Sequence, residues 1–181
     1  MALSATIFKA EIQISDIDRH YYQTHSLTIA QHPSETTERL MIRVLAFVMY
    51  AHERLSFGRG ISVQDEPDLA QKDLTGVLEH WIDVGQPDEA RIRRACSRAQ
   101  AVTIITYAGR NTETWWDKIA PALARFKNLR VFNVPVASSL ALATFAQRSM
   151  QLQCLIQDGL IEISTGERTV SIEGTMLRTP G

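Results

Sequence analysis

The fold is decided by residues 65–95, which read DEPDLAQKDLTGVLEHWIDVGQPDEARIRRA. Residues 76–84 alternate apolar and polar side chains, which predicts a strand with Asp83 near its end. A turn with glycine and proline follows, and then Asp88, a residue type that often caps the start of a helix. The stretch therefore predicts a strand, a sharp turn and a helix, with acids on the strand and arginines on the helix.

Outward from this stretch, the chain alternates between strand and helix patterns. Residues 34–54 are apolar over most of a helical circumference, which predicts a largely buried central helix with Ser34 as its N-cap. Residues 101–107, AVTIITY, form a continuous β-branched run that is typical of a buried parallel strand. Further helices are expected at residues 109–126 and 135–148, a short strand or loop at 56–63, and strands at 129–134 and 169–177.

Both ends of the chain have the pattern of antiparallel hairpins. Residues 5–15 and 21–30 alternate in polarity, and the segments 150–156 and 160–164 flank an Asp-Gly pair, which is a strong signal for a two-residue hairpin turn. Together with the strands and helices between them, these hairpins predict an α/β protein with a mixed sheet and helices on its faces. No linker divides the sequence, so all 181 residues are expected to form a single domain.

The composition excludes several classes of protein. Hydrophobic residues make up 45% of the chain, the net charge is -1 and the pI is about 6.5. This excludes a surface coated with basic residues for non-specific nucleic-acid binding, but it leaves room for a local basic groove. No apolar run reaches the roughly 18 residues of a membrane span, and the N-terminus lacks the basic region of a signal peptide. The widely spaced Cys96 and Cys154 are expected to fill the core in a reducing cytoplasm.

Acidic residues near turns provide a candidate site. Magnesium prefers hard oxygen ligands, of which one or two are carboxylates, and a hydrolytic site uses the ion to orient a water molecule and stabilise charge on a phosphate. A basic side chain nearby would offset the charge of the phosphoryl group. The candidate oxygen ligands are Asp68, Asp83, Glu35 and Glu79, and the candidate cations on the next helix are Arg91, Arg93 and Arg94.

The same residues also fit a purely structural role. Charged residues next to turns are usually solvated, helix arginines usually lie on the surface, and neighbouring acids could simply pair with those arginines. The five histidines have no metal-site spacing, and the Trp115-Trp116 pair is more typical of a core and its rim than of a base-stacking surface. The sequence lacks the P-loop, GxGxxG, GxSxG and HExxH motifs, which removes support for those mechanisms.

Several segments together resemble the YaeQ family of bacterial proteins. They are the opening MALSATIFKAEIQISDIDRHYY, HPSETTERLMIRVLAFVMYAHERLSFGRG (32–60), DEPDLAQKDLTG (65–76), WIDVGQPDEARIRRAC (81–96) and MQLQCLIQDG (150–159). The resemblance covers essentially the whole chain. The family in turn resembles the restriction-endonuclease-like nucleases that use a PD-(D/E)XK motif. This implies a mixed α+β roll, in which helices flank a core sheet and the added strands roll around it.

The resemblance implies roles for particular residues. Asp68, in the Pro67-Asp68 pair, matches the first metal-binding aspartate of those nucleases, and Asp83 matches the second acid. Glu35 matches the acid that the preceding helix contributes, and magnesium is the implied cofactor. The position of the catalytic lysine falls on Gly85, and glycine has no side chain that could assist the attacking water.

Two functions follow from this resemblance. The first is a cytoplasmic, magnesium-dependent nuclease or phosphodiesterase, in which Arg93 or Arg94 replaces the missing lysine. Such an arginine would clamp a phosphate but would be a poor base, because it is always protonated. The second is a non-catalytic binding or regulatory protein on the same fold, which the near-neutral charge and Gly85 favour. The expected partners are a nucleic acid in a local groove or another protein, and not a membrane.

Overall fold

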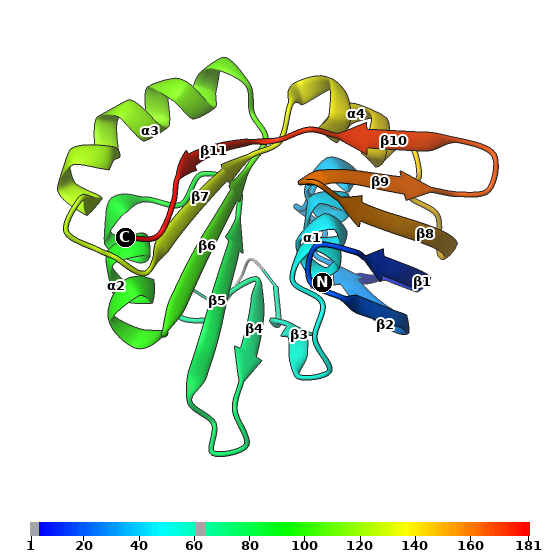
Figure 1. Cartoon of the computed structure of the whole chain (residues 1–181), viewed down its shortest axis with the longest axis horizontal. Coiled ribbons are helices and arrows are strands. Elements are labelled where there is room, and N and C mark those ends of the chain that lie inside the picture. The colour runs from blue at the N-terminus through cyan, green and yellow to red at the C-terminus, as the bar shows by residue number, and fades with distance from the viewer. Residues whose placement is uncertain (1–3, 61–63) are drawn as a thin grey trace.

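The structure is a computed structural model that describes residues 4–60 and 64–181. Within these residues the chain forms four helices and eleven strands, and the strands make two mixed sheets (Figure 1). The helices are α1 (Thr37–Met49), α2 (Glu89–Arg98), α3 (Arg110–Leu123) and α4 (Val136–Ala143). The strands are β1 (Thr6–Asp16), β2 (Tyr21–Gln31), β3 (Leu55–Phe57), β4 (Leu69–Lys72), β5 (Leu78–Val84), β6 (Ala101–Thr106), β7 (Leu129–Asn133), β8 (Ser149–Gln157), β9 (Leu160–Ser164), β10 (Thr169–Ile172) and β11 (Thr175–Arg178).

The first sheet joins the two ends of the chain, in the order β10-β9-β8-β1-β2. The pairs β1–β2 and β8–β9 are antiparallel hairpins, which confirms the prediction from their alternation. Asp158 and Gly159 both have positive φ angles, 53° and 77°, as the turn between β8 and β9 requires. The sequence pattern did not predict the parallel pairing of β1 with β8, because it joins segments that are far apart along the chain.

The second sheet has the order β11-β7-β6-β5-β4-β3. Its strands β5, β6 and β7 are parallel, whereas β3, β4 and β11 pair antiparallel with their neighbours. Helices α2 and α3 cover one face of the parallel strands, where Ile92, Ile119 and Leu123 pack in one cluster with Trp81 and Val102. Figure 1 shows both helices beside β5–β7 and away from β3 and β4, so that end of the sheet has no helix over this face.

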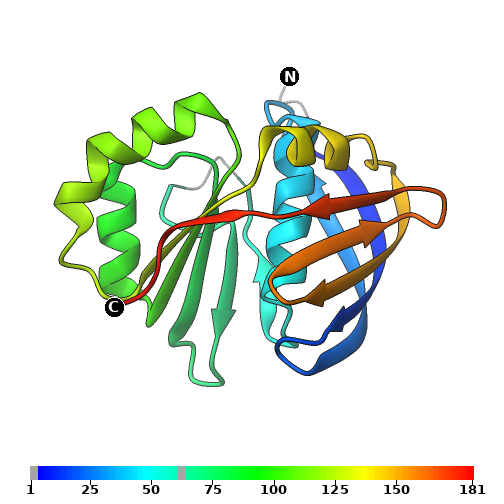
Figure 2. The ribbon, with the colours of Figure 1, turned by 45° about the horizontal axis from the view of Figure 1, so that its top comes forward.

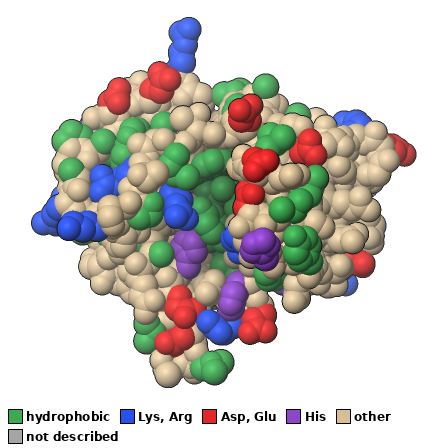
Figure 3. Space-filling model, viewed as in Figure 1, with side chains coloured by type: hydrophobic (Ala, Val, Ile, Leu, Met, Phe, Trp, Pro, Cys, Tyr) green, Lys and Arg blue, Asp and Glu red, His purple; other side chains and the backbone are tan. Residues whose placement is uncertain are grey.

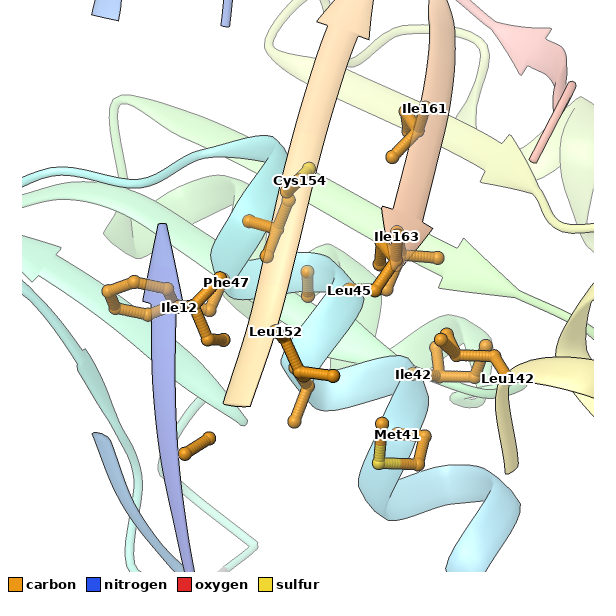
Figure 4. Packing of buried hydrophobic residues seen from close by; sticks show 14 of the residues in the cluster. Ile12, Met41, Ile42, Leu45, Phe47, Leu142, Leu152, Cys154, Ile161 and Ile163 are labelled. Carbon is orange, nitrogen blue, oxygen red and sulfur yellow. The ribbon is translucent and has the colours of Figure 1, made fainter. Parts of the chain in front are cut away.

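Helix α1 lies between the two sheets, and every residue from Leu40 to Val48 is buried. This confirms the predicted central helix. Figure 2 shows the first sheet curving around α1, and residues of β4 and β5 belong to the same buried cluster on the other side. The contacts between α1 and the first sheet are visible in Figure 4, which labels Met41, Ile42, Leu45 and Phe47 together with Ile12, Leu152, Cys154, Ile161 and Ile163.

The two sheets correct the expectation of one mixed sheet. The strand expected at residues 169–177 is split at Glu173 and Gly174, so β10 joins the first sheet and β11 joins the second. A Cβ atom on Gly174 would lie 2.0 Å from the ring of Phe132, so a side chain where the chain crosses would have to displace that buried ring. Glycine lets the chain cross with the ring in place, a constraint that strand periodicity does not reveal.

Some boundaries also differ from the sequence prediction. The N-cap of α1 is Thr36, whose side chain accepts from the backbone N–H of Arg39, whereas Ser34 bonds the ring of His32. The helix expected at 135–148 ends at Ala143. The segment expected at 56–63 begins within β3, and its residues 61–63 lie outside the described part of the chain.

Both cysteines are buried, which confirms their expected place in the core. Burial raises the pKa of Cys96 to about 11 and that of Cys154 to about 12, so both are protonated thiols at neutral pH. Among the helices of the described residues, none is long and apolar enough to cross a membrane.

Candidate functional site

Asp68 and Asp83 meet at one end of two neighbouring strands. Asp68 directly precedes β4, and the pairing of Leu69 with Ile82 brings it beside Asp83 of β5. The backbone N–H of Asp68 donates to Oδ1 of Asp83 at 3.1 Å, and the backbone N–H of Val84 donates to Oδ2 of Asp68 at 2.8 Å. Both residues are buried, with 7% and 1% of their surface exposed. The structure thus brings together the two acids that the sequence singled out.

Glu35 is connected to this pair through an arginine of α1. Its carboxylate accepts from Arg43 at 2.6 Å and from Arg39 at 2.5 Å. The other terminal nitrogen of Arg39 donates to Oδ1 of Asp68 at 2.8 Å. Residues 39 and 43 are about one helical turn apart, so their side chains lie on the same face of α1. Glu35 therefore reaches Asp68 through Arg39 and does not contact it directly.

Arg91 supplies the cation on the side of Asp83. Asp88 caps α2, as predicted, by accepting from the backbone N–H of Arg91, which fixes this residue in the first helical turn. The guanidinium then forms a two-pronged contact with Asp83, through Nε at 2.7 Å and Nη2 at 2.9 Å. It also donates to the backbone carbonyls of Gln64 and Glu66, so it ties the segment before Asp68 to the site.

Arg93 and Arg94 lie elsewhere, in contrast to the expectation that one of them serves the site. Arg93 pairs with Glu89 of its own helix, and Arg94 pairs with Asp65 at 2.9 Å. Arg93 is two residues beyond Arg91, which places it on the opposite side of α2. Of the three candidate arginines, only Arg91 contacts Asp83.

Glu79 is separated from Asp83 by a β-bulge. The register of β4 and β5 shifts between Gln71 and Lys72, which breaks the simple alternation that put Glu79 and Asp83 on one side. Glu79 instead accepts from Arg54 at 2.8 Å and from Gln71 at 2.9 Å. Figure 3 shows acidic and basic side chains gathered near the β4–β5 hairpin and the start of β3.

The paired acids and two of the arginines that hold them border a hollow of about 430 Å³. Arg39, Asp68, Asp83 and Arg91 line it, together with Gly85. Gly85 has a φ angle of 101°, a conformation that favours glycine, and its N–H donates to the carbonyl of Ile105. The turn after β5 therefore favours glycine at position 85, where the resemblance places the motif lysine.

The charges of the site balance one another. Three carboxylates, Glu35, Asp68 and Asp83, are held by three guanidinium groups, Arg39, Arg43 and Arg91. Burial raises the pKa of Asp83, the contact with Arg91 lowers it again, and the neighbouring charge of Asp68 raises it. Burial lowers the pKa of Arg39, but Asp68 and Glu35 raise it by more, so its net shift is upward. The network is therefore a set of mutually compensating ions.

The implied magnesium ion fits this arrangement poorly. All four carboxylate oxygens of Asp68 and Asp83 already accept a hydrogen bond, from Arg39, Arg91 or a backbone N–H. In the described part of the chain, no three His, Cys, Asp or Glu side chains are grouped so that they could hold a metal ion. Magnesium bound to both carboxylates would compete with the guanidinium groups of Arg39 and Arg91 for their oxygens.

The other aromatic and histidine candidates have structural contacts. The indole N–H of Trp115 donates to the carbonyl of Pro87 at 2.9 Å, and Trp115 and Trp116 pack against the cluster under α2 and α3. His80 is bonded to Thr103 at 2.8 Å, and burial lowers its pKa to about 4, so it is neutral at physiological pH. The structural interpretation of these residues is thereby favoured.

Gly58 positions Asp68 and yields the first prediction. Its N–H donates to the carbonyl of Asp68 at 2.8 Å, and a Cβ atom on it would lie 2.1 Å from the carbonyl oxygen of Pro67. Gly58→Ala should therefore push the Pro67-Asp68 backbone away and lower the free energy of unfolding by about 1–3 kcal/mol. Urea unfolding would measure this loss. Gly159→Ala is no control because of its positive φ, but Ser56→Ala, on the adjoining strand β3, should change stability by less than about 0.5 kcal/mol.

Known proteins resemble this chain over nearly its whole length. The proteins named "Uncharacterized protein YaeQ" of Salmonella typhi and Escherichia coli (strain K12) are 42% and 41% identical to it over 180 residues, or 99% of both chains. The crystal structure of a YaeQ protein from Xanthomonas axonopodis pv. citri is 49% identical, with a TM-score of 0.95 over 98% of this chain and all of the other. That from Pseudomonas syringae is 33% identical, with a TM-score of 0.93 over 97% of each chain.

The family model described as "YaeQ protein" matches residues 1–174. This match and the relatives agree with the resemblance found in the sequence segments, and the two sheets and four helices described above are shared with solved YaeQ structures. By sequence and by structure, this chain belongs to the YaeQ family.

Proposed function

We propose that the protein is a non-catalytic binding or regulatory protein built on a restriction-endonuclease-like core. The adjacency of Asp68 and Asp83 on β4 and β5, with Glu35 one arginine away, supports the relation to the nuclease core. The absence of turnover is supported by the way these acids are neutralised. Fold alone would not distinguish an enzyme from a binding protein, so the proposal depends on the contacts of these particular groups.

The observation that carries the proposal is that arginine and backbone donors occupy every oxygen of Asp68 and Asp83. A metal-dependent nuclease needs carboxylates with oxygens free for the ion and an acid–base group for the attacking water. Here the guanidinium of Arg91 contacts Asp83 where a metal ion would bind, and Gly85 stands at the position of the motif lysine. Because arginine stays protonated, Arg91 cannot take a proton from water.

A divalent-cation and cleavage assay tests this proposal. We expect isothermal titration calorimetry to show no tight manganese binding, and we expect no cleavage of single- or double-stranded DNA or RNA with magnesium or manganese. Glu113→Gln, at an exposed position of α3, serves as the matched control for Asp83→Asn. The proposal would be overturned by metal-dependent cleavage that Asp83→Asn abolishes without unfolding the protein and that Glu113→Gln leaves intact.

That outcome would establish the second candidate, a magnesium-dependent nuclease or phosphodiesterase. It is favoured by one observation, the meeting of two carboxylates at the border of a hollow of about 430 Å³. In this case Asp68 and Asp83 would hold the ion once Arg39 or Arg91 had moved. Magnesium would supply charge stabilisation for a phosphate, and Arg91 or Arg39 would contact the phosphate oxygens.

A further inference from the structure

A second hollow lies over β3 and β4. It is on the same face of the second sheet as α2 and α3, at the end that these helices do not cover. Its volume is about 340 Å³, within the size range of small-molecule pockets. Ser56 and Ala70 are paired across β3 and β4 and line it, and Lys72 and Leu78 are paired across β4 and β5 beyond the bulge. Arg98, at the end of α2, forms the opposite wall.

The carboxylates around this hollow already have partners. Glu66 pairs with Arg59 at 2.5 Å, and Asp65 pairs at 2.9 Å with Arg94, which is not part of the lining. Arg54, another lining cation, pairs with Glu79 at 2.8 Å. The acids at this surface are thus engaged with arginines one to one.

Lys72 and Arg98 are left without a carboxylate in this set of ion pairs. Among the described residues, Lys72 forms no salt bridge, and Arg98 donates only to the backbone carbonyl of Asp65, at 3.1 Å. The guanidinium carbon of Arg98 also lies 5.5 Å from the centre of the Trp81 ring, a cation–π contact that restrains it beside the hollow. Two cations that stand outside these ion pairs therefore line one concave surface, where Arg59, and to a smaller extent Lys72, lower the pKa of Glu66.

The chemistry of the lining selects the class of ligand. A lysine ammonium and an arginine guanidinium are both suited to phosphate oxygens, the first as a point charge and the second as a planar fork. The small side chains of Ser56 and Ala70 leave room at the base of the hollow, and Leu78 adds an apolar wall. We propose that this hollow binds a small organic phosphate, with its phosphate between Lys72 and Arg98 and its body against β3 and β4.

A long polyanion fits less well. Asp65, Glu66 and Glu79 are paired with arginines, so the phosphates that flank any one bound phosphate of a nucleic acid would meet ion pairs there and not further free cations. A small ligand with a single phosphate needs only Lys72 and Arg98. The volume also exceeds what inorganic phosphate alone would fill, so the organic part should contribute contacts of its own.

The test is a titration of the intact protein, without metal and with a chelator present, so its result is independent of any cleavage activity. Adenosine 5′-monophosphate and ribose 5-phosphate are the probes, and adenosine and ribose are their uncharged counterparts. We expect amide chemical shifts of β3, β4 and the end of α2 to move with both phosphates and not with the uncharged pair. Higher salt should weaken this binding, because exposed charges are screened.

The matched variants are Lys72→Met and Lys118→Met, which each remove one exposed lysine, the second on α3 and outside the hollow. Lys72→Met should weaken phosphate binding about tenfold through loss of a charged hydrogen bond, and Lys118→Met should leave it unchanged. Lys72→Glu should abolish it. The proposal fails if neither phosphate binds, if adenosine binds as tightly as its monophosphate, or if the two lysine variants behave alike. Equal or tighter binding of single-stranded nucleic acid through Lys72 would instead assign the surface to a polyanion.

Discussion

Replacing Glu35 with glutamine should lower the free energy of unfolding by about 3 kcal/mol, because it leaves a buried charge without its counter-ion. The side chain of Arg43 is 2% exposed and that of Glu35 is 1% exposed, so water cannot replace the lost partner. Nε of Arg43 already lacks a hydrogen-bond partner, and without Glu35 the guanidinium would keep only the bond from Nη2 to the carbonyl of Ala30, at 2.8 Å, and its contact with the Phe57 ring. Arg39 would suffer less, since it is 17% exposed and keeps Asp68. Urea unfolding at neutral pH measures the effect.

Two further variants separate this cause from a general loss of packing. Glu113→Gln makes the same chemical change at an exposed position of α3 and should shift stability by no more than about 0.5 kcal/mol. The double change Glu35→Gln with Arg43→Met removes both charges, so its loss should be smaller than the sum of the two single losses. Simple additivity would mean that Glu35 and Arg43 do not stabilise each other as a buried pair.

The elements of the fold were largely predictable from sequence, but their pairing was not. The apolar residues over most of the circumference of 34–54 predicted a largely buried central helix, which is the position of α1 between two sheets. The hairpin turn at Asp158-Gly159 was equally readable, because it needs two positive φ angles. The contact of β1 with β8 and the crossing at Gly174 depend on tertiary neighbours, and no local periodicity encodes them.

The site could also be predicted only in part, because some of its contacts depend on tertiary neighbours. The resemblance placed Asp68 and Asp83 together, and the structure has them in contact. Arg39 and Arg43 on α1 were missed as site residues, although their spacing of four and eight residues from Glu35, just before the helix, was a usable signal. The choice among Arg91, Arg93 and Arg94 required knowing how α2 is rotated about its axis, which its cap and its packing against Trp81 determine. Glu79 was misplaced because a bulge interrupts the alternation of β5.

Replacing Arg91 with methionine should also cost about 3 kcal/mol at neutral pH, because Asp83 is 1% exposed and would lose its two-pronged partner. Methionine keeps much of the apolar stem, so the loss reports the contacts of the guanidinium, which are the pair with Asp83 and the bonds to the carbonyls of Gln64 and Glu66. Arg93→Met, on the same helix but paired only with exposed Glu89, is the matched control. Its stability should change by no more than about 0.5 kcal/mol.

The pH dependence of this loss distinguishes an unpaired carboxylate from lost packing. Burial already raises the pKa of Asp83, and removal of Arg91 should raise it further. An acid whose pKa is higher in the folded state binds protons more tightly there, so it favours folding below its unfolded pKa and loses that contribution as pH rises through its folded pKa. The stability difference between wild type and Arg91→Met should therefore shrink as pH falls towards acid values and widen towards neutral pH. A constant difference across this range would show that packing by Arg91, and not neutralisation of Asp83, stabilises the site.

The same variant probes why the natural site is neutralised by arginine. With Arg91 absent, both oxygens of Asp83 would lose their guanidinium donor, while Asp68 would keep Arg39. A ligand that binds only the folded state raises its stability, so manganese should raise the melting temperature of Arg91→Met while leaving that of the wild-type protein unchanged. Such a gain would identify Arg91 as the group that takes the place of a metal ion in this pocket. If manganese stabilises both proteins equally, the carboxylates are open to metal despite Arg91, and the non-catalytic proposal loses its main support.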